Sequence, residues 1–142
     1  METKDKTTVT VETTIQMPAD QVWEFWTKPE HITQWNCATD TWQCPRAEND
    51  LTPGGRFLSR MEAKDGSMGF DFSGIYEQVI PNRQLVYRLD DGRLVRVDFS
   101  DMGNETKVTE NFEVEELNSL DLQRTGWQAI LDNFKKYAES KK

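Results

Sequence analysis

The sequence is poor in the residues on which metal binding and catalysis most often depend. It contains one histidine, His31, and two cysteines, Cys37 and Cys44. Paired cysteines of zinc sites are usually about two to four residues apart, whereas these two are more widely spaced and have no second pair of ligands. We therefore expect two reduced thiols, no metal site and no cofactor. We expect His31 to be solvated in a surface turn.

Motifs of nucleophilic catalysis and phosphate binding are also missing. There is no Gly-x-Ser-x-Gly element, and the single histidine has no sequence signal that places it beside Ser59 or a cysteine. The glycine pair of PGGRF, residues 53–57, lacks the lysine, the hydroxyl residue and the helix of a phosphate loop. The sequence therefore predicts no catalytic set.

Long basic and long apolar runs are absent as well. The formal net charge is -8 and the isoelectric point is about 4.7. This charge disfavours nucleic acid and anionic membranes as partners, because both are polyanions. No stretch approaches the roughly 18 apolar residues of a membrane-spanning helix, and the N-terminal METKDKTTV has no apolar signal region. We therefore predict a cytoplasmic protein without a membrane span.

What the sequence does contain is a regular succession of strand and helix patterns. Residues 7–16 alternate with period two, which predicts a half-buried strand. Residues 17–35 predict two short helices, the first of which ends at Pro29. Residues 39–45 fit a strand or an extended loop. From there, strands follow one another at hairpin spacing, separated by turns rich in glycine, proline, asparagine and aspartate.

The chain closes with an amphipathic segment. Residues 118–139 have apolar positions at helical spacing, and Asn118 or Ser119 can cap the helix. Strands followed by a segregated helix indicate an α+β protein, which we predict to be one domain over residues 1–142 with an ordered core at about 8–140. The helix must bury its stripe against a curved sheet, and the space between them favours a cavity.

One strand contains a conflict. Read with period two, residues 106–116 place Glu110 in the middle of an apolar face that also carries Val108 and Phe112. A carboxylate on a core face costs several kcal/mol unless it is paired or neutralised. Either Glu110 has a buried structural partner, or the face lines a cavity that admits water or ligand, or the register slips and Glu110 is exposed.

Five segments carry a resemblance to a known family. They are MPADQVWEFWTKPEHITQW (17–35), DLTPGGRF (50–57), GIYEQVIPNRQLVYRL (74–89), TKVTENFE (106–113) and GWQAILDNFKKYAE (126–139). They resemble the START-like, helix-grip (SRPBCC) superfamily, and within it the family named after the activator of the heat-shock-chaperone ATPase. The chain departs from many relatives in WNCATDTW, which follows the second short helix and in the family usually borders the cavity mouth.

The resemblance implies a fold and a range of functions. The implied fold is a curved antiparallel sheet of about six to seven strands around a long C-terminal helix, with two short helices after the first strand. The family has no universal catalytic set, and its members differ in ligand, activity and partners. The first hypothesis is binding of an apolar or aromatic small molecule, lipid-like or polyketide-like, in a cavity between the sheet and the helix.

Two alternatives remain open. One is an enzyme of cyclase or hydrolase type that uses Glu110 as acid or base on such a ligand. The other, the weakest, is a chaperone-interaction module, since eukaryotic chaperone activators usually join this domain to a separate N-terminal domain for which 142 residues leave no room. A homodimer also stays open as a partner.

Strand alternation and the helical stripe select the residues expected to contact a ligand. Most are apolar or aromatic, with a few polar points, as is usual for small-molecule pockets. They are Trp35, Trp42, Phe57, Ser59, Met61, Phe70, Phe72, Tyr87, Val97, Glu110, Phe112, Trp127, Ile130, Leu131 and Phe134. Gly126, inside the predicted helix, is expected to serve close packing rather than ligand contact.

Overall fold

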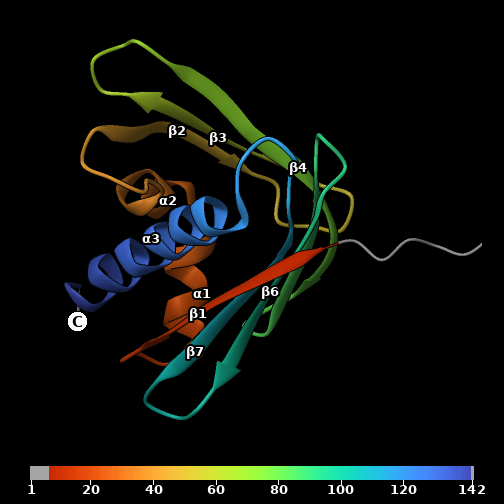
Figure 1. Cartoon of the computed structure of the whole chain (residues 1–142). Coiled ribbons are helices and arrows are strands. Elements are labelled where there is room, and N and C mark those ends of the chain that lie inside the picture. Colours follow the sequence, from red (N-terminus) through yellow and green to blue (C-terminus); the bar gives the residue numbers. More distant parts are fainter. Residues whose placement is uncertain (1–6, 142) are drawn as a thin grey trace, which may run out of the picture.

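The computed structural model describes residues 7–141, and residues 1–6 and 142 lie outside the described part. The single-domain prediction for residues 1–142 and the interpretation of METKDKTTV therefore fall partly outside it. Seven antiparallel strands form one curved sheet in the order β1-β7-β6-β5-β4-β3-β2, with two short helices after β1 and a long helix at the end of the chain. The predicted α+β, helix-grip fold is confirmed (Figure 1).

Ten elements make up this fold. They are β1 (Thr8–Ile15), α1 (Ala19–Thr27), α2 (Pro29–Trp35), β2 (Trp42–Asn49), β3 (Arg56–Ala63), β4 (Gly69–Ile80), β5 (Gln84–Leu89), β6 (Leu94–Asp101), β7 (Thr106–Glu113) and α3 (Leu120–Glu139). Strands β2 to β7 follow one another as hairpins, and β1 pairs with β7 at the far edge.

The two short helices carry the chain from one edge of the sheet to the other. Pro29 separates them as predicted, and it also occupies the first turn of α2, where the missing N–H costs nothing. In the ambiguous segment 39–45, residues 39–41 form a bend and a turn, and residues 42–45 form the start of β2, which pairs with β3. Helix α2 packs against β2, so this end of the molecule is filled by helices (Figure 1).

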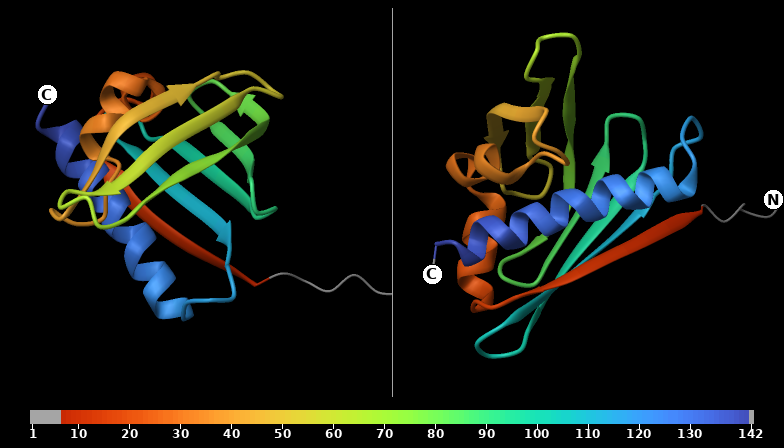
Figure 2. Two further views of the ribbon diagram at one scale, coloured as in Figure 1. Left: turned by 90° about the horizontal axis from the view of Figure 1, so that it is seen from above. Right: turned by 60° about the vertical axis from the view of Figure 1, so that its left-hand side comes forward.

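Helix α3 crosses the concave face of the sheet. Its N-cap is Ser119, whose side chain accepts a hydrogen bond from the Leu122 N–H at 3.1 Å, which confirms one of the two predicted caps. The helix packs along β1, and its C-terminal half lies beside α1 and α2. The two views of Figure 2 show the strands curling around the helix.

Close approach of strands explains one glycine in the sheet. A Cβ on Gly74 would lie 2.4 Å from the main-chain oxygen of Arg88 on β5, which no side chain tolerates. The register then shifts after Tyr76, where β4 carries a bulge relative to β5. Tyr76 nevertheless points inward and is 6% exposed, so the bulge leaves it on the cavity face.

His31 is the one sequence interpretation that the fold overturns outside the cavity. We expected a solvated surface side chain, but Nδ1 of His31 lies 2.7 Å from the Tyr137 hydroxyl of α3. The imidazole also meets the edge of the Phe25 ring at 4.5 Å between centroids. His31 is half-buried because it joins α2 to the end of α3, a contact between segments far apart in the sequence.

Candidate functional site

A cavity of about 430 Å³ lies between the sheet and α3. The walls come from β3, β4 and β5, from α1 and α2, and from the N-terminal half of α3. Ten of the fifteen residues predicted to contact a ligand line it: Trp35, Phe57, Ser59, Met61, Phe70, Phe72, Tyr87, Glu110, Trp127 and Ile130. Period-two alternation therefore predicted correctly which faces of β3, β4, β5 and β7 line the cavity.

Five residues of the predicted set do not line the cavity, each for a packing reason. Val97 is completely enclosed between its register partners on β5 and β7. Phe112 is covered by the stacked indole of Trp127, with 4.0 Å between ring centroids. Trp42 lies at the start of β2 beside Phe70, with the ring centroids 6.0 Å apart.

The other two belong to the C-terminal half of α3. Leu131 and Phe134 are fully buried in solid core. The Phe134 ring packs edge-on against Trp26 and Trp35, at 4.8 and 4.9 Å between centroids. Helical periodicity correctly predicted that Leu131 and Phe134 face inward. It could not predict that other side chains fill the space at this end of α3.

Glu110 is the deepest charged group of the cavity. It lies in the middle of β7, between Val11 of β1 and Val97 of β6 in the strand register. It is 5% exposed. Within residues 7–141, no hydrogen bond or ion pair to its carboxyl group is present. No fully enclosed side-chain oxygen or nitrogen in this part of the chain lacks a partner, so the unbonded oxygens of Glu110 must border open space, which the cavity provides.

Burial alone sets the acidity of this carboxyl group. It raises the pKa of Glu110 from 4.5 to about 8, because removal from water disfavours the charged form. Near neutral pH the group is therefore mostly protonated and can donate as well as accept a hydrogen bond. Of the three explanations for a carboxylate on this face, the structure excludes exposure and shows no structural partner among residues 7–141.

A tyrosine neighbours the carboxyl group. Tyr87 of β5 is 7% exposed and lines the same cavity. Burial raises its pKa well above 10, and the charge of Glu110 adds to the shift. A second hydroxyl, that of Tyr76, donates to Oδ1 of Asn49 at 2.7 Å and is thereby fixed. The cavity thus offers Glu110 and Tyr87 as adjacent polar groups within aromatic walls.

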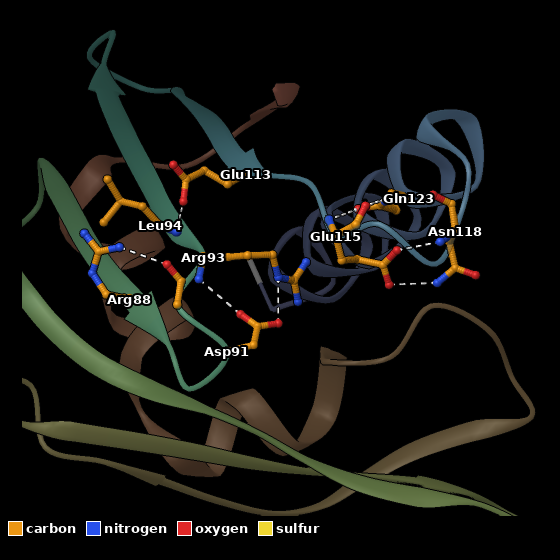
Figure 3. A network of polar contacts seen from close by, with 9 residues as sticks. Arg88, Asp91, Arg93, Leu94, Glu113, Glu115, Asn118 and Gln123 are labelled. Carbon is orange, nitrogen blue, oxygen red and sulfur yellow. Dashed lines mark hydrogen bonds and ion pairs between the residues drawn. The ribbon is translucent and has the colours of Figure 1, made fainter. Parts of the chain in front are cut away.

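One end of the cavity is built from a polar network that sequence reasoning missed (Figure 3). Arg93, in the turn between β5 and β6, donates from Nε to Oδ2 of Asp91 at 2.8 Å. The Glu115 carboxylate accepts from N and Nδ2 of Asn118, at 2.7 and 2.8 Å. Gln123 of α3 ties this loop down by donating to the main-chain oxygens of Glu115 and Asn118.

The residues of this polar network lie in turns and at the start of α3. The spacing of hydrophobic residues in the sequence could therefore not identify them. Four of them line the cavity: Arg93, Glu115, Asn118 and Gln123. The hydrogen bonds from Asn118 lower the pKa of Glu115, and the positive charge of Arg93 contributes to that shift. Figure 3 shows the Arg93 side chain extending toward Glu115.

Ten further residues complete the lining, and they come from the short helices, the loop that follows them, β2, β4, β5 and α3. They are Trp26, Ile32, Asn36, Ala38, Glu48, Asn49, Tyr76, Leu85, Leu122 and Gly126. Asn36 and Ala38 belong to WNCATDTW, the segment in which the chain departs from many relatives. The prediction for Gly126 was wrong: a Cβ there would have no packing partner within 4 Å, so the glycine serves no close packing.

Known proteins resemble this chain in sequence and in fold. Residues 16–139 match the family model described as Activator of Hsp90 ATPase homolog 1-like protein. The chain belongs to this family. Proteins with this helix-grip fold typically bind ligands, although the family by itself names no ligand for this chain. No curated protein matches the sequence.

Several solved structures have the same architecture. The AHSA1-like protein from Aeromonas hydrophila is 40% identical, with a TM-score of 0.89, and the match covers 95% of this chain and 94% of that one. Chr148 from Cytophaga hutchinsonii is 47% identical, with a TM-score of 0.80 and coverage of 93% and 92%. Protein NE0264 from Nitrosomonas europaea, 18% identical with a TM-score of 0.78 and coverage of 95% and 96%, shares the fold alone.

The described residues include no cluster of side chains that could bind a metal ion. Among residues 7–141, no three or more histidine, cysteine, aspartate or glutamate side chains gather in a way that could hold a metal ion. Cys37 and Cys44 are free thiols, and burial raises the pKa of each. None of the helices within the described part of the chain is long and apolar enough to span a membrane.

Proposed function

We propose that this protein binds an apolar or aromatic small molecule, lipid-like or polyketide-like, in the cavity between the sheet and α3. The proposal rests mainly on Glu110, which is 5% exposed and lines a cavity of about 430 Å³. Its carboxyl group has no hydrogen-bond or ion-pair partner within residues 7–141. A buried group without a partner destabilises the fold, so its presence is best explained by a ligand that bonds to it.

The cavity has the composition of a small-molecule site. Its size lies within the range of about 300–1,000 Å³ that is usual for ligand pockets. Aromatic side chains such as Phe57, Phe72 and Trp127 form most of the wall, and a few polar groups interrupt it. Such a wall supplies affinity by burial, while Glu110 and Tyr87 fix the orientation of a ligand.

Native mass spectrometry of freshly purified protein tests this proposal, followed by identification of the released molecule. We expect a stoichiometric adduct with a mass of a few hundred daltons. The matched control is Gly126→Leu, because Gly126 lines the cavity and a Cβ there would have no packing partner within 4 Å, so the larger side chain should take up part of the cavity. An adduct that is unchanged in Gly126→Leu would show that the molecule binds elsewhere. Absence of any adduct, together with no binding of naphthylmethanol, would contradict the proposal.

A second function is favoured by the same carboxyl group. A pKa of about 8 lets Glu110 take up and release protons near neutral pH, which is the property of a general acid or base. The discriminating measurement is turnover of the identified ligand. An enzyme should lose turnover in Glu110→Gln while it still binds the ligand, whereas a binding protein should return the ligand unchanged.

A further inference from the structure

The charged groups of the cavity are unequally distributed. Besides its tyrosines, four ionisable side chains line it, and three of them carry carboxyl groups: Glu48, Glu110 and Glu115. The fourth is Arg93, whose Nε is engaged by Asp91. The chain as a whole carries a formal net charge of -8. The field at the cavity therefore favours a positively charged ligand over an anionic one.

Within the described residues 7–141, no cationic side chain pairs with Glu110. Arg93 acts on Tyr87 and Glu115 through its charge, but burial is the only cause of the raised pKa of Glu110. The nearest strand partners, Val11 and Val97, are apolar. Among residues 7–141, no positive group is therefore placed to satisfy this carboxylate, and a bound ligand can supply one.

Aromatic rings that contact one another line the same cavity as Glu110. The Phe57 ring packs edge-on against Tyr87 at 4.8 Å and lies 5.4 Å from Tyr76, centroid to centroid. Phe72 lies between this group and the indole of Trp127, at 6.0 Å from Phe57 and 6.1 Å from Trp127. Ring faces attract a desolvated cation, and aromatic cages with a carboxylate are well suited to bind ammonium groups.

We infer that the ligand is a hydrophobic amine, whose ammonium group pairs with the Glu110 carboxylate among the rings of Phe57, Tyr87 and Trp127. This inference rests on the proposed function, since it names the chemical class of the molecule in the same cavity. A neutral ligand with a carbonyl group, which would accept a hydrogen bond from protonated Glu110, is the competing outcome of the test.

The proton balance of this binding step predicts its pH dependence. An alkylamine, like the lysine side chain, has a pKa near 10, so it enters as ammonium and Glu110 releases its proton to solvent. The other ionisable groups that line the cavity are Glu48, Tyr76, Tyr87, Arg93 and Glu115. Burial raises the pKa of both tyrosines, and hydrogen bonds from Asn118 lower the pKa of Glu115, so these shifts lie away from the window between pH 6 and 8. Amine affinity should therefore rise by up to about tenfold per pH unit from pH 6 to 8 and then level off.

Three probes of one shape separate the possible ligands. Naphthylmethylamine, naphthylmethanol and naphthoate share an aromatic body and differ in the charge of the polar end. We expect calorimetry near pH 8 to show the amine binding about 10-fold to 100-fold more tightly than the alcohol, and naphthoate binding most weakly. Glu110→Gln should abolish the preference for the amine, while Glu12→Gln, which removes the same charge from the outer face of β1, should keep it.

The outcomes test two claims separately: that the ligand is an amine, and that the cavity binds a small molecule at all. An amine that binds no more tightly than the alcohol, or a preference that survives Glu110→Gln, overturns the inference but leaves a binding cavity. Tightest binding by the alcohol with no rise between pH 6 and 8 supports the neutral ligand instead. If none of the three probes binds, the inference and the proposed function fail together. Melting curves of both variants verify that each is folded.

Discussion

The two halves of α3 face the same sheet but meet different surroundings. In the C-terminal half, Leu131, Phe134 and Ala138 are fully buried, and aromatic rings from α1 and α2 fill the space beside them. In the N-terminal half, Gly126 and Trp127 border the cavity, and Ile130, at the middle of the helix, borders it as well. The two short helices cover only one end of the concave sheet, so the other end stays hollow.

This difference shows how one fold supplies both stability and a site. Close packing at one end orders the helix on the sheet, and the ordered helix then forms a wall for the hollow end. The carboxyl group of Glu110 is tolerable at the hollow end, where it borders open space, and would be much more costly at the filled end.

Phenylalanines at the two ends allow the largest test of this comparison. Phe134 is fully buried, whereas Phe72 is half-buried at the cavity wall. We expect Phe134→Ala to lower the free energy of unfolding by about 3–5 kcal/mol and Phe72→Ala by only about 1 kcal/mol. Urea unfolding curves measure both values, and equal losses would show that the two ends are packed alike.

The pH dependence of stability tests the hollow end next. The pKa of Glu110 is raised from 4.5 to about 8, so between these values the folded chain binds the proton more tightly than the unfolded chain. The stabilising effect of this proton is complete below pH 4.5 and is lost as the pH rises to 8. Relative to Glu110→Gln, the wild type should lose roughly 1.4 kcal/mol of unfolding free energy per pH unit in this window.

Paired denaturation curves of the wild type and Glu110→Gln between pH 5 and 8 provide the measurement. Other carboxylates titrate identically in both proteins and cancel in the difference. A difference that stays constant across the window would mean that the Glu110 carboxyl group is solvated rather than buried, and the cavity would then be wider at this point than the structure shows.

The comparison of the two ends also explains what the sequence could and could not predict. Period-two alternation was sufficient to place Glu110, Phe57 and Ser59 on the inner face, because a strand's side chains strictly alternate. The stripe on α3 predicted that Phe134 and Ile130 face inward, but it carries no information on which end of the helix is hollow. That depends on where α1 and α2 pack, a contact between distant segments.

The residues that the sequence did not predict also depend on contacts outside their own strand or helix. Arg93 and Glu115 lie in connections between elements, and their positions depend on the turn geometry and on hydrogen bonds to Asn118 and Gln123. His31 looked like a surface residue because its partner, Tyr137, lies at the other end of the sequence. Local patterns contain no signal for contacts of this kind.

Replacing Glu110 by leucine separates ligand binding from stability at the hollow end. Glu110→Leu should keep the fold and raise the free energy of unfolding near pH 8, since it removes a costly buried group. The same change should weaken binding of a ligand that meets the carboxyl group by about 1–3 kcal/mol. Calorimetry with naphthylmethylamine and urea unfolding measure the two effects. A variant that is less stable than the wild type would reveal a structural partner of Glu110.

The smallest expected effect concerns Gly126. A glycine inside a helix is destabilising by about 0.5–1 kcal/mol relative to alanine, and a Cβ at this position would have no packing partner within 4 Å. Gly126→Ala should therefore raise the free energy of unfolding by about that amount. The reverse change, Ala129→Gly on the same helix, should lower it by a similar amount, and urea unfolding resolves both. If Gly126→Ala destabilised the protein instead, the space beside this residue would be filled, and the hollow end of α3 would begin beyond it.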